Sequence, residues 1–226
     1  MLFHRTGFQR SSVAMVNSLF LLALELHAYE TPLSPASVHE AWVLGQRNDQ
    51  ATADFLTPYL QQVAEKAAGG PHIVDIEVLT PFAEVVDESR KKLNGYTEQQ
   101  ALQEYHHRGD RVTVRILLML PAAYPKQEQS PGAANSQKQD TALRPENFWQ
   151  NFRFNMKQRG KIIATRSIHD KPIYSAPTKD VPAVLDGASV WLEYDARDVA
   201  SEPATVVVVT PEAKTIEATF DLKKLR

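Results

Sequence analysis

The stretch "RVTVRILLML", residues 111–120, decides how the second half of this sequence is organised. Every second residue in it is aliphatic, at positions Val112, Val114, Ile116, Leu118 and Leu120. This period of two places one face of a β-strand against a core. Arg111 and Arg115 occupy alternate positions to these residues, which suit a more polar face. The stretch therefore predicts a long strand at the start of a β-rich region.

Further strands are expected on the carboxyl side of this stretch. They cover residues 147–158, 161–168, 188–196, 204–210 and 215–222. Arg159-Gly160 is a tight-turn signal between the first two, and "PEAK" (211–214) connects the last two. Short strands with turns between them indicate an antiparallel β-sandwich, Ig-like or similar.

The amino-terminal half has mainly helical patterns. Ser34 and Pro35 suit a helix start, and apolar residues then recur at helical spacing at Val38, Ala41, Trp42 and Gly45. We expect all four to face the interior. We also expect a helix ending at Gly69-Gly70, with an apolar stripe made of Leu56, Leu60, Val63 and Ala67.

One strand and two more helices complete this half. Residues 72–80 alternate, which predicts a strand with Asp75 and Glu77 on a wet face. Helical patterns follow from Thr80-Pro81 and over residues 97–107, where Thr97 and Gln100 form a capping-box pattern. The expected fold class is α+β, with a helix-rich part over 29–110 and the β-sandwich over 111–226.

Two segments are expected to lie outside the folded core. Residues 1–28 have a basic start, a mostly apolar stretch over 13–26, and Ala28 at a candidate cleavage point, which is typical of an export signal. A retained anchor or a buried helix is the alternative. Residues 121–146 are rich in Pro, Gln, Ser and Ala, so we expect a disordered insertion rather than a binding lid.

The composition of the chain speaks against several classes of function. The chain has 226 residues with a formal net charge of −2, which gives no electrostatic case for nucleic-acid binding. It has no cysteine, which removes disulfides, thiolate metal sites and cysteine nucleophiles. The sequence thus indicates an exported, periplasmic or extracellular protein with no stable membrane span once the signal is removed.

His39-Glu40 forms the first half of a zinc-protease signature. The second histidine should follow four residues after the first, so that both reach one metal ion from one helix face. Position 43 is Val43 instead. We therefore expect no metal and no cofactor here, and a solvent-facing helix surface.

Candidate catalytic residues are confined to one polar cluster, made of His106, His107 and Asp110. Adjacent histidines diverge on a helix, so a site would need His72 or His169 with further acids brought in by folding. A solvated helix end, with histidine near the negative end of the helix dipole, is the simpler interpretation.

Trp149 and Trp191 are the candidate ligand-binding residues. Each shares a predicted strand face with polar residues, so the two rings could stack on a sugar or anchor a partner. Burial under the amino-terminal helices is the alternative. The sequence alone leaves the choice open.

Three stretches, "HEAWVLGQRND" (39–49), "TPFAEVV" (80–86) and "TPEAKTIEATFDLKKL" (210–225), resemble a set of exported bacterial proteins described only as hypothetical. The resemblance implies export and this order of helices and strands, and it transfers no catalytic residue. The expected function is a non-catalytic extracytoplasmic module that binds a protein or a cell-envelope component. The alternatives are a hydrolase whose site is assembled from distant polar residues, and a carbohydrate or small-ligand binder that uses the tryptophans.

Overall fold

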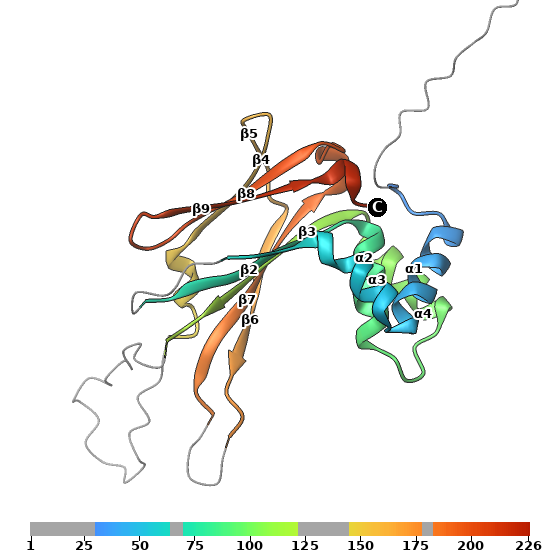
Figure 1. Ribbon diagram of the computed structural model, residues 1–226, viewed down its shortest axis with the longest axis horizontal. Helices are drawn as coiled ribbons and strands as arrows, with labels where there is room; N and C mark the ends of the chain where they lie inside the picture. Colours follow the sequence, from blue (N-terminus) through green and yellow to red (C-terminus); the bar gives the residue numbers. More distant parts are fainter. Residues whose placement is uncertain (1–29, 64–69, 122–144, 178–182) are drawn as a thin grey trace, which may run out of the picture.

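The computed structural model describes residues 30–63, 70–121, 145–177 and 183–226. This part of the chain contains four α-helices and two antiparallel sheets, so the fold class is α+β (Figure 1). The predicted signal (1–28) and nearly all of the predicted insertion (121–146) lie outside the described residues. No helix among the described residues is long and apolar enough to cross a membrane.

The larger sheet has five strands in the order β1-β2-β3-β7-β6. Their bounds are β1 Leu60–Gln62, β2 His72–Leu79, β3 Arg111–Met119, β6 Ser167–Tyr174 and β7 Leu185–Asp195. The smaller sheet has the order β5-β4-β8-β9. Its strands are β4 Arg153–Gln158, β5 Lys161–Ile163, β8 Pro203–Val209 and β9 Thr215–Asp221. β1 and β2 precede two of the helices, so the helices are not a separate amino-terminal block.

The helices gather on one side of the five-stranded sheet (Figure 1). They are α1 Pro35–Arg47, α2 Gln50–Leu56, α3 Pro81–Lys91 and α4 Glu98–Arg108. Short 3-10 turns occur at Thr57–Tyr59, Phe148–Asn151, Ala196–Asp198 and Leu222–Lys224. α1 packs on both α3 and α4, and α3 follows β2 after a single residue, which brings it back over the sheet.

The prediction for α1 is confirmed at its start and on most of its inner face. Ser34 caps the helix by accepting a hydrogen bond from the Ser37 N–H. Val38, Ala41 and Gly45 are buried, whereas Trp42 is half-buried and donates its indole N–H to the Tyr96 carbonyl at 3.2 Å. Asn48 ends the helix in the left-handed conformation. Trp42 therefore anchors α1 partly by a hydrogen bond rather than by full burial.

The prediction for the second helix is wrong beyond Leu56. α2 ends there, Pro58 lies in a 3-10 turn, and Leu60 belongs to β1 with an exposed side chain. Pairing of β1 with β2 takes these residues out of the helix. Val63 is half-buried and its N–H bonds the Val74 carbonyl, while Ala67 lies outside the described residues.

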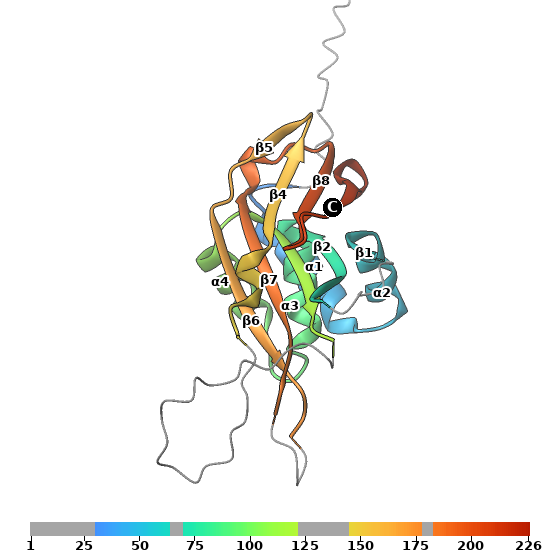
Figure 2. The same ribbon diagram turned by 90° about the vertical axis from the view of Figure 1, so that its left-hand side faces the viewer.

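The core is built from alternating residues, as predicted for β3. Val112, Val114, Ile116 and Leu118 are fully buried. Facing residues of β7 and inward residues of the smaller sheet belong to the same hydrophobic cluster. The two sheets lie close together in both ribbon views (Figures 1 and 2). The alternate residues of β3, beginning with Arg111, therefore point to the opposite face of the larger sheet.

The predicted wet face of β2 is only partly correct. A bulge between Ile73 and Asp75 changes the alternation, and Val74 and Asp75 are both half-buried. Glu77 is only 4% exposed. It is buried because α3 covers this face and Arg115 of the neighbouring strand pairs with it.

Several strand boundaries differ from the prediction. The strand predicted over 147–158 starts at Arg153, because residues 148–151 form a 3-10 turn. The strand predicted over 161–168 divides into β5 and β6, which belong to different sheets. The strand predicted over 188–196 begins earlier, at Leu185, so Gly187 lies inside β7. Gly187 fits there because a Cβ atom would lie 2.2 Å from the Leu118 carbonyl oxygen.

Both predicted hairpins are confirmed. β4 and β5 are joined by Arg159 and Gly160, whose φ angles of 49° and 74° match a two-residue type I′ turn. β8 and β9 pair over their whole length around the predicted "PEAK" turn. Local turn chemistry thus fixes these pairings.

Candidate functional site

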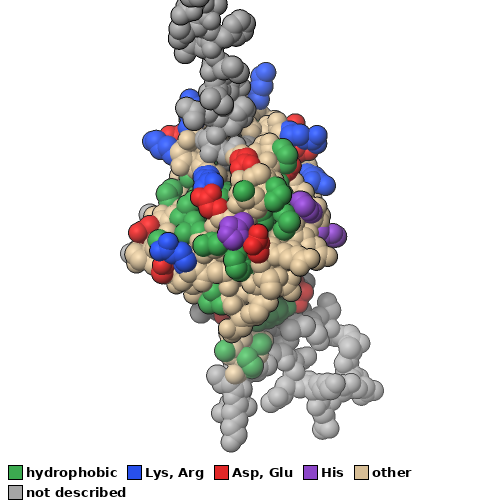
Figure 3. Space-filling model, turned by 90° about the vertical axis from the view of Figure 1, so that its right-hand side faces the viewer, with side chains coloured by type: hydrophobic (Ala, Val, Ile, Leu, Met, Phe, Trp, Pro, Cys, Tyr) green, Lys and Arg blue, Asp and Glu red, His purple; other side chains and the backbone are tan. Residues whose placement is uncertain are grey.

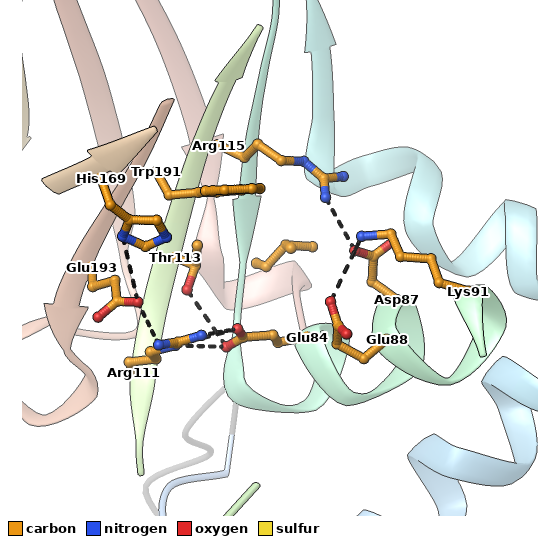
Figure 4. A pocket seen from close by; sticks show the side chains of 11 residues that line it. Glu84, Asp87, Glu88, Lys91, Arg111, Thr113, Arg115, His169, Trp191 and Glu193 are labelled. Atoms are coloured by element: carbon orange, nitrogen blue, oxygen red, sulfur yellow. Dashed lines mark hydrogen bonds and ion pairs between the residues drawn. The ribbon is translucent and has the colours of Figure 1, made fainter. Parts of the chain in front are cut away.

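A cavity of about 200 Å³ lies between α3 and the outer face of the five-stranded sheet (Figure 4). We call it the α3 cavity. Its lining combines charged and aromatic side chains: Leu79, Glu84, Asp87, Glu88, Lys91, Arg111, Thr113, Arg115, His169, Trp191 and Glu193. These residues come from α3 and from β2, β3, β6 and β7.

Two periodicities bring the polar residues together. In β3 the residues Arg111, Thr113 and Arg115 alternate with the core residues and share the outer face. In α3 the residues Glu84, Asp87, Glu88 and Lys91 recur at spacings of three and four, which keeps them on one helix face. The cap of α3 at Thr80, directly after β2, fixes that face towards the sheet.

Arg111 connects α3 to β7. Its Nη2 atom lies 2.6 Å from Glu84 Oε1, and its Nε donates to both oxygens of the same carboxylate at 3.2 Å. Its Nη1 donates to Glu193. Burial lowers the pKa of Arg111, but the hydrogen bonds and charges of Glu84 and Glu193 raise it by more. The guanidinium is therefore permanently charged and held in one orientation.

Arg115 makes a second bridge between the sheet and the helix. Its Nη1 lies 3.2 Å from Asp87 Oδ2, and its Nη2 pairs with Glu77 of β2. Asp87 also accepts from Lys91 at 2.5 Å and from Arg90. Burial raises the pKa of Asp87, but Lys91 and Arg115 lower it by more. Asp87 is therefore ionised at neutral pH.

Glu77 lies beneath Arg115. Burial raises the pKa of Glu77, an effect that the charge of Arg115 opposes and the charge of Asp87 reinforces. The pKa values of the buried carboxyl groups of Asp87 and Glu77 thus shift in opposite directions. Glu77 does not line the cavity, so its role is to hold Arg115 from below.

An aromatic wall closes one side of the α3 cavity. Trp191 of β7 and His169 of β6 are paired across the sheet, with ring centroids 5.0 Å apart. His169 Nδ1 lies 4.0 Å from Glu193, whose other oxygen accepts from the Ser167 hydroxyl at 2.7 Å. Figure 4 shows the indole ring of Trp191 edge-on beside Arg115, with Thr113 between it and the Arg111–Glu84 pair. Trp191 and His169 therefore share the outer sheet face with Arg115, the β3 partner of Trp191, and the carboxylates of α3 lie on the other side of the cavity.

His106, His107 and Asp110 lie away from this cavity. The two histidines are exposed at the end of α4, and Figure 3 shows histidine side chains on the surface of this side of the molecule. Asp110 accepts a hydrogen bond from Tyr105. The structure does not bring His72 or His169 into contact with them in any interaction among the described residues, and His169 lies in the α3 cavity instead.

The two candidate tryptophans are in different places. Trp191 is half-buried and lines the α3 cavity. Trp149 is half-buried in the 3-10 turn before β4 and packs against the core. The fold therefore separates them, and only Trp191 belongs to the cavity.

His39 and Glu40 are exposed on α1 and bind other side chains. His39 Nδ1 lies 2.8 Å from Glu98 Oε2, and both oxygens of Glu40 lie 2.5 Å from the guanidinium of Arg226. Within the described residues no group of three or more His, Asp or Glu side chains is placed to hold a metal ion.

Sequence reasoning missed most of the cavity. Its signal was present in the polar faces of the strands, where acids and arginines occupy positions that alternate with the core: Glu77, Arg111, Arg115 and Glu193. Such charges of opposite sign on neighbouring strands are typical of cross-strand pairs. The strand order that makes them neighbours could not be derived from one sequence.

No protein-family model matches the chain, and no curated protein matches it either. The functional argument therefore depends on the geometry of the α3 cavity.

Proposed function

We propose that this chain is a non-catalytic, extracytoplasmic binding module, and that the α3 cavity holds its ligand, a component of the cell envelope. We also propose that the shared core makes the two sheets a β-sandwich of the Ig-like kind, with the helices covering one outer face. The export pattern over 1–28 is the basis for the proposed location.

One observation carries the binding proposal. The α3 cavity has an aromatic wall beside charged side chains that are already paired, through Arg111 with Glu84 and Glu193, and through Arg115 with Asp87. Ion pairs that join three strands to a helix hold their side chains in place before a ligand arrives. Preorganised polar groups around an apolar surface favour binding.

Asp87, Arg111 and Arg115 are poorly suited to proton transfer in this cavity. A general acid needs a pKa near the working pH, whereas the pKa of Asp87 is shifted downward. Arg111 and Arg115 are poor bases because guanidinium groups stay protonated. The catalytic candidates from the sequence, His106, His107 and Asp110, lie outside the cavity, and His169 is the histidine that lines it.

Co-sedimentation tests this proposal. The purified full-length chain is mixed with isolated bacterial cell-envelope fragments, and the bound protein is measured. We expect binding that Trp191→Ala and His169→Ala both reduce at least fivefold, and that Trp149→Ala leaves unchanged. Trp149 is the matched control because it is also a half-buried tryptophan. Circular dichroism verifies that each variant is folded.

Two results would overturn the proposal. Binding that is equal in Trp191→Ala, His169→Ala and the unchanged protein would remove the α3 cavity as the ligand site. Release of soluble fragments from the envelope, lost in His106→Ala or Asp110→Asn, would identify a hydrolase instead.

A further inference from the structure

We infer that the α3 cavity binds one uncharged sugar ring. This inference rests on the proposed function, because it names the ligand class of the same site. It follows from the size of the cavity, its aromatic wall and the balance of its charges.

Size limits the ligand to one ring. The cavity volume is about 200 Å³. Clefts that enclose drug-sized ligands have volumes of roughly 300–1,000 Å³. A single six-membered ring with its hydroxyl groups matches the smaller space, so an oligosaccharide would place one unit inside and the rest outside.

The aromatic wall suits the apolar side of a sugar. The face of an indole ring carries partial negative charge, which attracts the slightly positive C–H hydrogens on one side of a pyranose. His169 is packed beside Trp191 at 5.0 Å between ring centroids and restricts the orientation of the indole. Leu79, which is 3% exposed, adds an apolar contact at the base of the cavity.

The charged side chains around the aromatic wall suit hydroxyl groups. An arginine has five N–H donors, and the carboxylates that bind Arg111 and Arg115 fix the direction of those that remain. Glu88 is the carboxylate held most loosely, with its oxygens 3.8 Å from Lys91 and 3.3 Å from Lys92. A ligand hydroxyl can therefore donate to Glu88 while weakening the existing ion pairs less than it would at the other carboxylates.

Charge balance excludes strongly charged ligands. The lining contains four carboxylates, Glu84, Asp87, Glu88 and Glu193, and three permanent cations, Lys91, Arg111 and Arg115. An anion would face the four acids, and a cation would face the three bases. Either would have to displace an existing ion-pair partner and leave that partner uncompensated in a confined space. A neutral polyhydroxylated ring adds no charge and leaves the ion pairs of Arg111 and Arg115 intact.

Nuclear magnetic resonance can test this inference residue by residue. The chain has three tryptophans, Trp42, Trp149 and Trp191, which give three indole N–H signals that Trp→Phe variants assign. The full-length protein is titrated with methyl glucoside, methyl galactoside and methyl mannoside. We expect the Trp191 signal to move and saturate for at least one of them, with a dissociation constant on the order of 1 mM, as small ligands allow. The Trp42 and Trp149 signals should stay in place.

Matched charged rings make the comparison specific. Glucuronic acid adds a negative charge to the same ring, and glucosamine adds a positive one. We expect both to bind at least tenfold more weakly than the neutral sugar. Adding Glu88→Gln should weaken the neutral sugar by several-fold, whereas Glu212→Gln, an exposed residue outside the cavity, should have no effect.

The two proposals fail in different ways. If envelope fragments bind through Trp191 but no neutral ring moves its signal, or a charged ring binds more tightly, the sugar inference is wrong and the binding module stands. If neutral rings bind at Trp191 but envelope fragments do not bind at all, the cell-envelope assignment is wrong and the sugar site stands. If neither binds, both are wrong.

Discussion

Gly45 of α1 lies directly against the backbone of Val86 in α3. A Cβ atom on Gly45 would lie 2.4 Å from the Val86 carbonyl oxygen and 2.5 Å from the Cβ of Ser89. No side chain fits in that space, so the two helices pack at a distance that only glycine permits. Because α3 carries four of the eleven residues that line the cavity, this contact also sets the position of the site.

Replacing Gly45 with alanine should therefore destabilise the protein by about 1–3 kcal/mol, the usual range for overpacking. The effect opposes helix propensity, which favours alanine over glycine by about 1 kcal/mol. Urea denaturation measures it. Val43→Ala, on the exposed side of the same helix, is the control and should change stability by less than about 0.5 kcal/mol. An increase in stability in Gly45→Ala would show that the helices are not held this closely.

Asp87 should make the protein sensitive to acid. Its pKa is lower in the folded protein than in the unfolded chain, so the unfolded chain binds a proton first as the pH falls. The stability that Asp87 contributes is thus complete at neutral pH and is lost as the pH falls below about 4. Denaturation between pH 2.5 and 7 should show that the free energy of unfolding falls less steeply with acid in Asp87→Asn than in the unchanged protein. An equally steep fall would contradict the pairing of Asp87 with Lys91 and Arg115.

Glu77 should act with the opposite sign. Burial raises its pKa, so the folded protein binds the proton more tightly than the unfolded chain does. Its contribution therefore becomes less favourable as the pH rises above about 4.3 towards the folded-state pKa. Glu77→Gln removes this titration. The free energy of unfolding of this variant should therefore rise more between those two pH values than it does in the unchanged protein. A smaller rise would contradict the assignment.

Glu40 and Arg226 should be coupled, although the sequence suggested only a solvent-facing helix surface at Glu40. The two Nη atoms of Arg226 each lie 2.5 Å from an oxygen of Glu40. The Cζ atom of Arg226 lies 4.2 Å from the centre of the Phe82 ring. Both side chains are about half exposed. A double-mutant cycle with alanine should give a coupling of about 0.5–1 kcal/mol that falls with salt. The exposed pair Asp221 and Lys224 is the control and should give less.

Trp42 should contribute through its hydrogen bond as well as through packing. Trp42→Phe keeps most of the ring but removes the bond to the Tyr96 carbonyl, and should cost about 1 kcal/mol. Trp42→Ala should cost less than the roughly 3–5 kcal/mol of a fully buried aromatic residue, because the ring is half-buried. Thermal or urea denaturation measures both. Equal losses in the two variants would mean that packing contributes nothing.

The parts of the fold that follow from local chemistry could be predicted from the sequence. The caps at Ser34, Thr80 and Thr97 determine where three helices begin, and Arg159-Gly160 determines a hairpin. The region around Leu60 could not be predicted, because pairing with β2 overrides its helical spacing. The start of β7 at Leu185 also could not be predicted, because Gly187 lies in that strand through its close approach to β3.

The candidate site was less predictable than the fold. Trp191 could be identified because an aromatic residue on a polar strand face is unusual. Its partners come from segments far apart in the sequence, such as Glu84 in α3 and His169 in β6. Their meeting depends on the order of the strands and on the covering helix, and neither leaves a periodic signal within any one segment.

The position of β7 between β3 and β6 has a consequence for how the chain folds. β3 ends at Met119, but the strand that pairs with it along its whole length begins at Leu185. During synthesis the edge of β3 that pairs with β7 therefore stays unpaired until the intervening residues have emerged. Contacts so distant in sequence slow folding. Under the export that we propose, a growing chain that stays open in this way can still pass through a translocation channel before its largest sheet closes.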